Sequence, residues 1–152
     1  MIKDSGQRRE FPSGAVRDCA DSENNPKGRC DLIPVAVMAD ILADIQLTYI
    51  SLFLDDYRTE HLYNALKCFA DQYYECEETM FLEVAKHFEE GALKYGENNW
   101  QKGIPEKYYI DSAIRHYLKF MRGDTDEPHD RAFVWNLLCC IWEVDYHGKT
   151  TE

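Results

Sequence analysis

Apolar residues recur at every third or fourth position over most of this chain, and that spacing predicts helices. Such runs cover five stretches, at residues 34–54, 62–73, 78–95, 105–123 and 126–144. We find no alternating apolar and polar run of the strand type, and no hairpin dipeptide between such runs. The predicted fold is therefore all-α, a bundle of about five helices.

The last predicted helix, at residues 126–144, is apolar on nearly all sides from Ala132 onward. A helix of that composition is expected at the centre of a fold. Asn136 is its polar exception, and a buried amide without hydrogen-bond partners costs about 1–3 kcal/mol. Within 78–95, Gly91 indicates close approach of a neighbouring helix or a ligand, because an interior glycine costs roughly 1 kcal/mol against alanine.

Residues 1–33 interrupt the helical pattern with glycine and proline, and we expect an irregular N-terminal arm ahead of a helical domain at 34–147. One interpretation is a loosely docked or disordered tail. The other is a loop that folds over a site and places cations on phosphate groups. The second interpretation draws on the arm's basic residues, which are Arg8, Arg9, Arg17, Lys27 and Arg29.

The whole chain is acidic, with 28 acidic and 17 basic residues and a formal net charge of −11. That balance argues against a nucleic acid or an anionic membrane as the main partner, because phosphate backbones bind basic faces. The six cysteines form no CxxC pair, which favours reduced thiols in a cytoplasmic protein. The apolar stretch 35–54 contains Asp40 and Asp44, so we do not expect a membrane span.

Two groups of polar residues are candidates for chemistry. The first is a stripe on one face of the predicted helix 78–95, formed by Glu83, His87, Glu90 and Lys94 at i, i+4, i+7 and i+11. Such a face is often only solvated. Its oxygen ligands with one imidazole are nevertheless a donor set that suits Mg²⁺ or Mn²⁺.

The second group is an acidic knot at the start of the last predicted helix. The helix dipole by itself favours acidic residues at that position. Glu127 and Asp130 stand at i and i+3, however, so both carboxylates are expected to face one cation, with His129 beside them. The knot comprises Asp124, Asp126, Glu127, His129 and Asp130.

Five motifs in this order resemble the phage and bacterial dATP/dGTP diphosphohydrolase family, which is similar to the MazG-like (MazZ-type) all-α nucleotide pyrophosphohydrolases. They are FPSGAVRD (11–18), KGRCDLIP (27–34), GALKYGENNWQKG (91–103), DSAIRHYLKFMRG (111–123) and DEPHDRAFVWN (126–136). The resemblance implies hydrolysis of a purine deoxynucleoside triphosphate to the monophosphate and pyrophosphate. It also implies dependence on Mg²⁺ or Mn²⁺ and assembly as a homodimer or homotetramer. The cytoplasmic location that the cysteines favour would be the host cytoplasm for a phage protein.

The MazG-like enzymes bind metal through an ExxE on one helix and an ExxD on a later one. Glu127 and Asp130 fit the ExxD, whereas Glu83, His87 and Glu90 occupy the place of the ExxE with a different spacing. The metal ligands expected from this comparison are Glu83, Glu127, His129 and Asp130. The expected catalytic residues are His87, Glu90, Lys94 and Arg115, and the expected substrate-binding residues are Lys27, Arg29, Asn98, Asn99, Trp100, His116 and Asn136.

Within this scheme Glu90 or His87 orients or deprotonates the attacking water. The cations hold phosphate oxygens, and residues 98–100 contact the purine. Two other functions stay open. One is a non-catalytic helical module that binds a nucleotide or a protein, which the imperfect ExxE favours. The other is a phosphohydrolase of the HD type, for which His129 and Asp130 supply the dipeptide.

Overall fold

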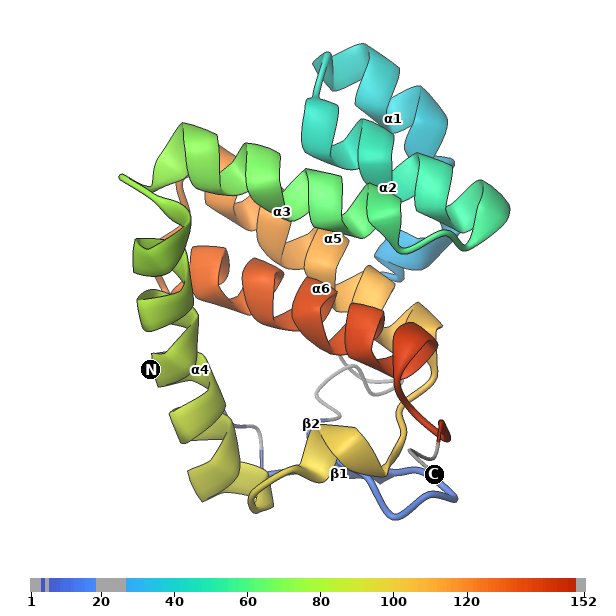
Figure 1. Ribbon diagram of the computed structural model, residues 1–152, viewed down its shortest axis with the longest axis vertical. Helices are drawn as coiled ribbons and strands as arrows, with labels where there is room; N and C mark the ends of the chain where they lie inside the picture. The colour runs from blue at the N-terminus through green and yellow to red at the C-terminus, as the bar shows by residue number, and fades with distance from the viewer. Residues whose placement is uncertain (1–3, 5, 19–26, 150–152) are drawn as a thin grey trace.

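The structure is a computed structural model, and it describes residues 4, 6–18 and 27–149. Six α-helices account for most of these residues, which confirms the all-α prediction (Figure 1). The helices are α1 (Val35–Leu42), α2 (Ile45–Asp56), α3 (Glu60–Tyr73), α4 (Glu77–Tyr95), α5 (Glu106–Arg122) and α6 (His129–Asp145). There are also two short 3₁₀ helices: η1 (Cys30–Leu32) precedes α1, and η2 (Asn99–Lys102) lies between α4 and α5.

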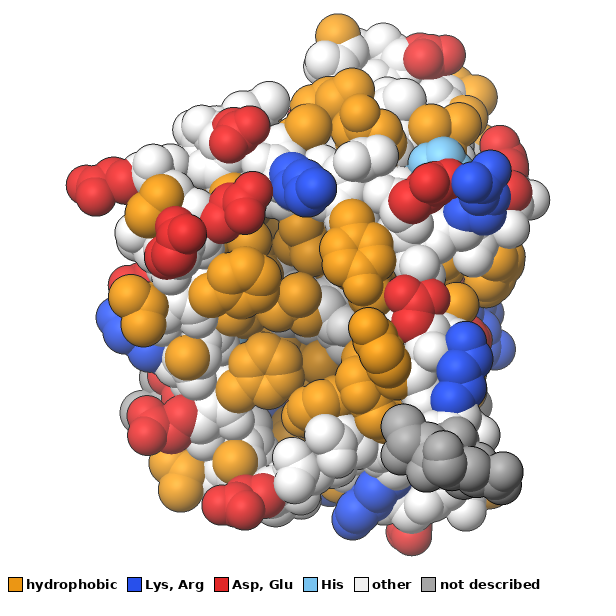
Figure 2. All heavy atoms as spheres, viewed as in Figure 1, with side chains coloured by type: hydrophobic (Ala, Val, Ile, Leu, Met, Phe, Trp, Pro, Cys, Tyr) orange, Lys and Arg blue, Asp and Glu red, His pale blue; other side chains and the backbone are white. Residues whose placement is uncertain are grey.

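Helix α6 is the central element, as its composition predicts. It packs against α5, α4 and α3, and it crosses the middle of the molecule in Figure 1. The rings of Phe133 and of Tyr117 on α5 contact each other at a tilt, with centroids 4.9 Å apart, and both are fully buried. On the face drawn in Figure 2, hydrophobic side chains gather across the middle, over α6 and the helices beside it. None of the described helices is long and apolar enough to cross a membrane.

The predicted single helix at 34–54 is wrong, because the chain breaks between α1 and α2. Ala43 ends α1 in the left-handed conformation, with φ 50°. Asp44 then begins α2, where its carboxylate accepts a hydrogen bond from the Leu47 N–H at 2.9 Å. Asp44 is a strong N-cap residue, and the Tyr117 hydroxyl of α5 also donates to its carboxylate. This carboxylate therefore links the start of α2 to the core.

The prediction of an arm without strands is also wrong in part. Residues of β1 (Arg8–Glu10) pair antiparallel with β2 (Val16–Asp18), with Arg9 opposite Arg17. Gly14 makes the turn, at φ +89°. Phe11 is buried against the Tyr108 ring of α5, so this hairpin is docked on the helices. Residues 19–26, which include Cys19, lie outside the described part of the chain.

Two local expectations need correction. Helix α6 begins at His129 with Pro128 as its cap, and not at residue 126. Glu127 therefore lies ahead of the helix, where helical i, i+3 spacing does not apply. A Cβ added at Gly91 would meet no atom within 4 Å, so no neighbouring helix approaches it closely. Gly91 faces a cavity instead.

Candidate functional site

A cavity of about 650 Å³ lies between the hairpin, α4, α5 and α6. Its lining includes six basic and four acidic side chains, although the chain as a whole has a net charge of −11. The basic side chains are Arg9, Arg17, Lys27, Lys94, Arg115 and Lys119, and the acidic ones are Asp4, Asp18, Asp111 and Glu127. The fold thus gathers positive charge at one place in an acidic protein.

Helix α4 contributes one face to this cavity, through His87, Gly91 and Lys94. Glu83 and Glu90 of the predicted stripe do not line it. Glu83 pairs with Lys86 at 3.0 Å, and Glu90 lies 3.8 Å from the Arg131 guanidinium. Burial, with the charge of Arg131, lowers the pKa of His87 to about 4. The His87 ring is therefore neutral near pH 7, and its buried Nδ1 has no partner among the described residues.

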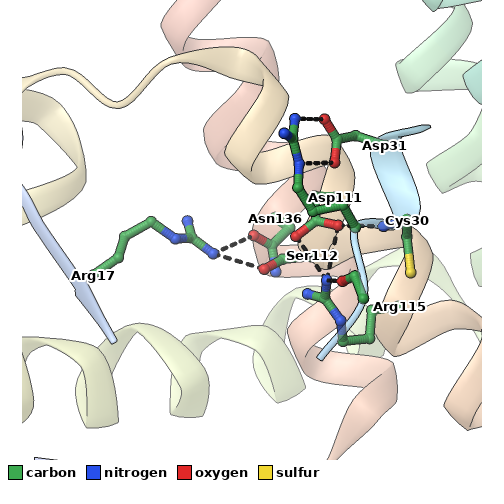
Figure 3. A network of polar contacts seen from close by, with 9 residues as sticks. Arg17, Cys30, Asp31, Asp111, Ser112, Arg115 and Asn136 are labelled. Atoms are coloured by element: carbon green, nitrogen blue, oxygen red, sulfur yellow. Dashed lines mark hydrogen bonds and ion pairs between the residues drawn. The ribbon is translucent and has the colours of Figure 1, made fainter. Parts of the chain in front are cut away.

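Arg17 of β2 lines the cavity, and its side chain points toward Ser112 and Asn136 (Figure 3). Its Nη2 donates to the Ser112 hydroxyl at 2.9 Å and to the Asn136 side-chain oxygen at 3.2 Å. The guanidinium lies over the Tyr109 and Trp135 rings, 5.2 and 5.7 Å from their centroids. Its Nη1 is buried without a hydrogen-bond partner, and no carboxylate of the described chain pairs with Arg17.

Asn136 finds the partners that a buried amide requires. Its Nδ2 donates to the Ala132 carbonyl at 2.8 Å, and its oxygen accepts from Arg17. The amide therefore fixes the orientation of a cation that lines the cavity. Asn136 itself also lines the cavity, which keeps it a candidate for contact with a ligand.

Asp111 and Arg115, four residues apart on α5, form the ion pair that their spacing predicts, at 2.8 Å. Asp111 also accepts from the Cys30 N–H at 2.6 Å, and Arg115 donates to the Gly28 carbonyl. This network ties the segment before α1 to α5 (Figure 3). Of the predicted arm cations there, Lys27 lines the cavity, whereas the half-exposed Arg29 pairs with Asp31 at 2.7 Å.

Two histidines meet at the edge of the cavity. Nδ1 of His116 lies 2.9 Å from Nδ1 of His129, and Nε2 of His129 lies 2.7 Å from the Asp126 carboxylate. With Glu127 these rings form a group whose ligand atoms all lie within 4.8 Å of one another. Such a group has the side chains needed to hold a metal ion. A second group, which shares His129, contains Asp124 and Asp126.

Mg²⁺ takes oxygen ligands in proteins, so two imidazoles and one carboxylate do not match its preference. Both groups found among the described residues contain an imidazole, and neither contains Glu83 or Asp130. Asp130 instead accepts a hydrogen bond from the Tyr74 hydroxyl at 2.7 Å. Burial and this carboxylate raise the pKa of Tyr74, so it stays protonated. Of the four predicted metal ligands, only Glu127 and His129 belong to one of these groups.

Of the residues expected to contact the purine, Asn99 and Trp100 contact other parts of the protein. The Asn99 side chain accepts from the Val16 N–H at 2.9 Å and donates to the Val16 carbonyl at 2.7 Å, so it holds β2 in place. The Trp100 ring packs on the Trp142 ring, with centroids 5.0 Å apart. Asn98 is exposed at the start of η2. Asn99 lines the cavity, and the other two do not.

The site roles expected from the sequence leave out several lining residues, although Arg9 and Arg17 are among the arm cations expected over a site. Arg9, Arg17 and Asp18 reach the cavity only because the hairpin folds back on the helices. Ser112 and Lys119 lie on α5 near the predicted Arg115 and His116, at positions that helical spacing places on one side. The usable signal was the concentration of arginine in an arm of an acidic chain, together with the motif at residues 11–18.

Comparison with known proteins bears on what this site does. The family model described as dATP/dGTP diphosphohydrolase, N-terminal, matches residues 72–152, which is more than half of the chain. The chain belongs to this family. The dATP/dGTP diphosphohydrolase match begins at the end of α3 and includes α4, α5 and α6, the helices that line the cavity. A search of curated proteins and a search of solved structures both gave no match.

Proposed function

We propose that this protein hydrolyses a purine deoxynucleoside triphosphate, dATP or dGTP, to the monophosphate and pyrophosphate. Family membership makes it a diphosphohydrolase by name. The observation that supports the reaction most directly is the basic cavity of about 650 Å³ in a chain with a net charge of −11. That volume is within the usual range for small-ligand sites, and the cations complement a triphosphate.

In this proposal Arg17 binds a phosphate oxygen through its unpartnered Nη1. A guanidinium that is already oriented by Ser112 and Asn136 presents this donor without further ordering. Lys94 reaches the same cavity from α4, where it lies 3.6 Å from Asp18. Lys27 and Arg115, the latter paired with Asp111, also line the cavity. These cations stabilise the negative charge that develops on the phosphate oxygens during transfer.

The reaction itself needs a water that attacks the α-phosphorus. The new bond joins the water oxygen to that phosphorus, and the bond to the β-phosphate oxygen breaks to release pyrophosphate. We propose the Glu90 carboxylate as the acceptor of the water's proton; in this structure it lies beside Arg131 and outside the cavity lining, so this role requires its side chain to turn toward the cavity beside Gly91. His87 is a poor acceptor near pH 7 because its pKa is about 4, so its role is to orient the water.

A divalent cation is expected in this reaction, and Glu127 with His129 is the pair of predicted ligands that the structure brings together. The donor set there does not fit Mg²⁺, so no step of the proposed chemistry is assigned to a Mg²⁺ ion.

Product analysis tests the proposal. The purified full chain is incubated with each dNTP and NTP, with Mg²⁺, with Mn²⁺ or with EDTA, and the products are separated by ion exchange. We expect monophosphate and pyrophosphate from dATP or dGTP with a divalent cation, and neither with EDTA. A matched pair of variants, Glu90→Gln and Glu89→Gln, separates the proposed base from its exposed neighbour.

Two other results would overturn the proposal. Nucleoside and inorganic triphosphate would indicate the HD-type reaction. No turnover of any triphosphate, with saturable nucleotide binding retained, would indicate a non-catalytic nucleotide-binding module.

We also propose that the protein acts as a homodimer or homotetramer in the cytoplasm. Large apolar side chains are exposed on the single chain, among them Ile41 at 77%, Leu82 at 71% and Leu93 at 86%. Exposed apolar side chains are commonly covered by association. Light scattering coupled to gel filtration is expected to give a mass of twice or four times 17.8 kDa, and a mass of 17.8 kDa would contradict this assembly.

A further inference from the structure

We propose that His116, Glu127 and His129 form a binding site for a divalent transition-metal ion of the zinc class, oriented by Asp126. Two imidazoles with one carboxylate are a donor set that zinc uses in catalytic sites, with a further coordination position left open. The role of the ion in catalysis rests on the proposed diphosphohydrolase reaction, whereas its binding does not.

The spacing of the two rings supports this assignment. Two nitrogens that each lie about 2.1 Å from one tetrahedral ion are themselves about 3.4 Å apart. The Nδ1 atoms of His116 and His129 lie 2.9 Å apart, so the two rings need to move apart by only a few tenths of an ångström to bind one ion. Glu127 supplies a carboxylate oxygen within 4.8 Å of both rings.

Asp126 fixes the tautomer that the site requires. A carboxylate only accepts hydrogen bonds, so Nε2 of His129 carries the proton that it donates to Asp126 at 2.7 Å. Nδ1 of His129 then presents its lone pair to His116 and Glu127. This arrangement of carboxylate, histidine and metal is the usual one around ligating histidines. His129 is 1% exposed, so the ring is held rigidly.

The position of the group places the ion beside the phosphate site. His116 and Glu127 line the basic cavity, and Glu127 also borders a depression on the outer side. The open coordination position therefore has access to a ligand in the cavity.

The alternative group of Asp124, Asp126 and His129 is less suitable. Arg122 holds Asp124 through two hydrogen bonds, and Asp126 is already the partner of His129. An ion there would have to displace the Arg122 guanidinium from the partly buried Asp124 carboxylate. The two groups differ in whether His116 takes part, and that difference is open to direct measurement.

The test is Co²⁺ titration of the metal-stripped full chain without nucleotide, followed by visible absorption. We expect one Co²⁺ per chain, with the absorption of a four- or five-coordinate ion. Equimolar Zn²⁺ should displace it, and a large excess of Mg²⁺ should not. His116→Asn and Glu127→Gln should each abolish this spectrum, whereas the matched control His61→Asn on α3, whose ring pairs with Asp56, should keep it.

Asp126→Asn should keep the spectrum and weaken binding by about 10- to 100-fold, because it removes an outer partner and no ligand. Circular dichroism of each metal-free variant establishes that it is folded. The inference is overturned by no Co²⁺ absorption, by displacement with Mg²⁺, or by a spectrum that Asp124→Asn removes and His116→Asn leaves intact. Since nucleotide is absent, failure of the proposed reaction would not affect these results.

Discussion

Arg17 is a partly buried cation of the cavity whose Nη1 has no hydrogen-bond partner among the described residues. Burying part of a cation without a carboxylate partner is unfavourable by several kcal/mol in general. The stacking of Arg17 on Tyr109 and Trp135 and its two hydrogen bonds offset only part of that cost. An anionic ligand that reaches Nη1 would supply the missing interaction. This single side chain is therefore the clearest indication that the cavity binds a negatively charged group.

Substitution of Arg17 tests its role in phosphate binding. Arg17→Gln is expected to lower kcat/KM for dATP or dGTP by about 10- to 100-fold, because a charge-assisted hydrogen bond contributes about 1.5–3 kcal/mol. Arg17→Lys should recover only part of the loss, since lysine lacks the planar fork. The control is Arg58→Gln, which removes an exposed arginine paired with Glu60. An unchanged kcat/KM in Arg17→Gln would remove Arg17 from the site.

The titration of His87 gives a prediction for stability. Burial, with Arg131, lowers the pKa of this ring from 6.5 to about 4, so the unfolded chain binds more protons below pH 6.5. Keeping the His87 ring neutral in the folded protein carries no cost above pH 6.5. As pH falls from 6.5 to 4, the unfolded chain takes up this proton first, and the free energy of unfolding decreases. The full size of this decrease is on the order of 3 kcal/mol. Urea unfolding from pH 7 to pH 4 measures it.

His87→Gln is the comparison for that experiment, since carboxylates also titrate near pH 4 and are common to both proteins. We expect the stability of the variant to fall less steeply between pH 6.5 and 4. Equal slopes in the two proteins would show that His87 does not titrate in this way. The quantity to compare is the slope of the free energy of unfolding against pH, because the substitution also changes the absolute stability at pH 7.

Among the secondary-structure elements, the hairpin β1–β2 has the largest effect on the site. It has only three residues in each strand, so its position depends on contacts with the helices. Asn99 provides two of these contacts by bonding both backbone groups of Val16. Ser13 adds another by donating to the Gly103 carbonyl at 2.5 Å. Placement of Arg9, Arg17 and Asp18 follows from this docking.

Loss of the Asn99 side chain should therefore loosen the hairpin. Asn99→Ala is expected to lower the free energy of unfolding by about 1–3 kcal/mol, because it removes the partner of two part-buried backbone groups of Val16. Amide exchange at Val16 should become faster, and KM for the nucleotide should rise. Hydrogen exchange measured by mass spectrometry checks the first result, with Asn64→Ala on the exposed face of α3 as the control. Unchanged exchange at residues 8–18 would show that other contacts suffice.

For the whole molecule, the relevant property is the separation of charge. The chain has a net charge of −11, yet its cavity presents more basic than acidic side chains. Under the proposed function, an acidic surface would disfavour extended polyanions such as nucleic acids, while the small cavity would admit a compact one. Size and charge together select for a ligand such as a nucleotide.

Tripolyphosphate, which has the phosphates of the proposed substrate without its base, tests this selection. A ligand at 100 times its Kd stabilises the native state by about 2.7 kcal/mol. For a chain of this size the melting temperature should rise by roughly 5–10 °C. Sulfate at equal ionic strength is the control, and Arg17→Gln should reduce the shift. Equal shifts with sulfate and tripolyphosphate would indicate a general salt effect and no phosphate site.

How much the sequence predicts depends on the range of the interactions. The helical period located α4 and α5 to within one or two residues, and the pairing of Asp111 with Arg115 follows from local spacing. The break at Ala43 was missed, because Asp44 caps α2 with help from Tyr117, which is distant in sequence. Apolar periodicity has no information about such a contact.

The sequence by itself determined an all-α protein of the dATP/dGTP diphosphohydrolase family, because helix formation follows local periodicity and family membership follows motif order. Tertiary structure decided the site. Arg17 and Asn136 meet from positions 119 residues apart, and His116 and His129 come within hydrogen-bond distance only because α5 and α6 pack together. Helical spacing fixes neighbours along one helix, whereas a cavity is formed by side chains that only packing between elements brings together.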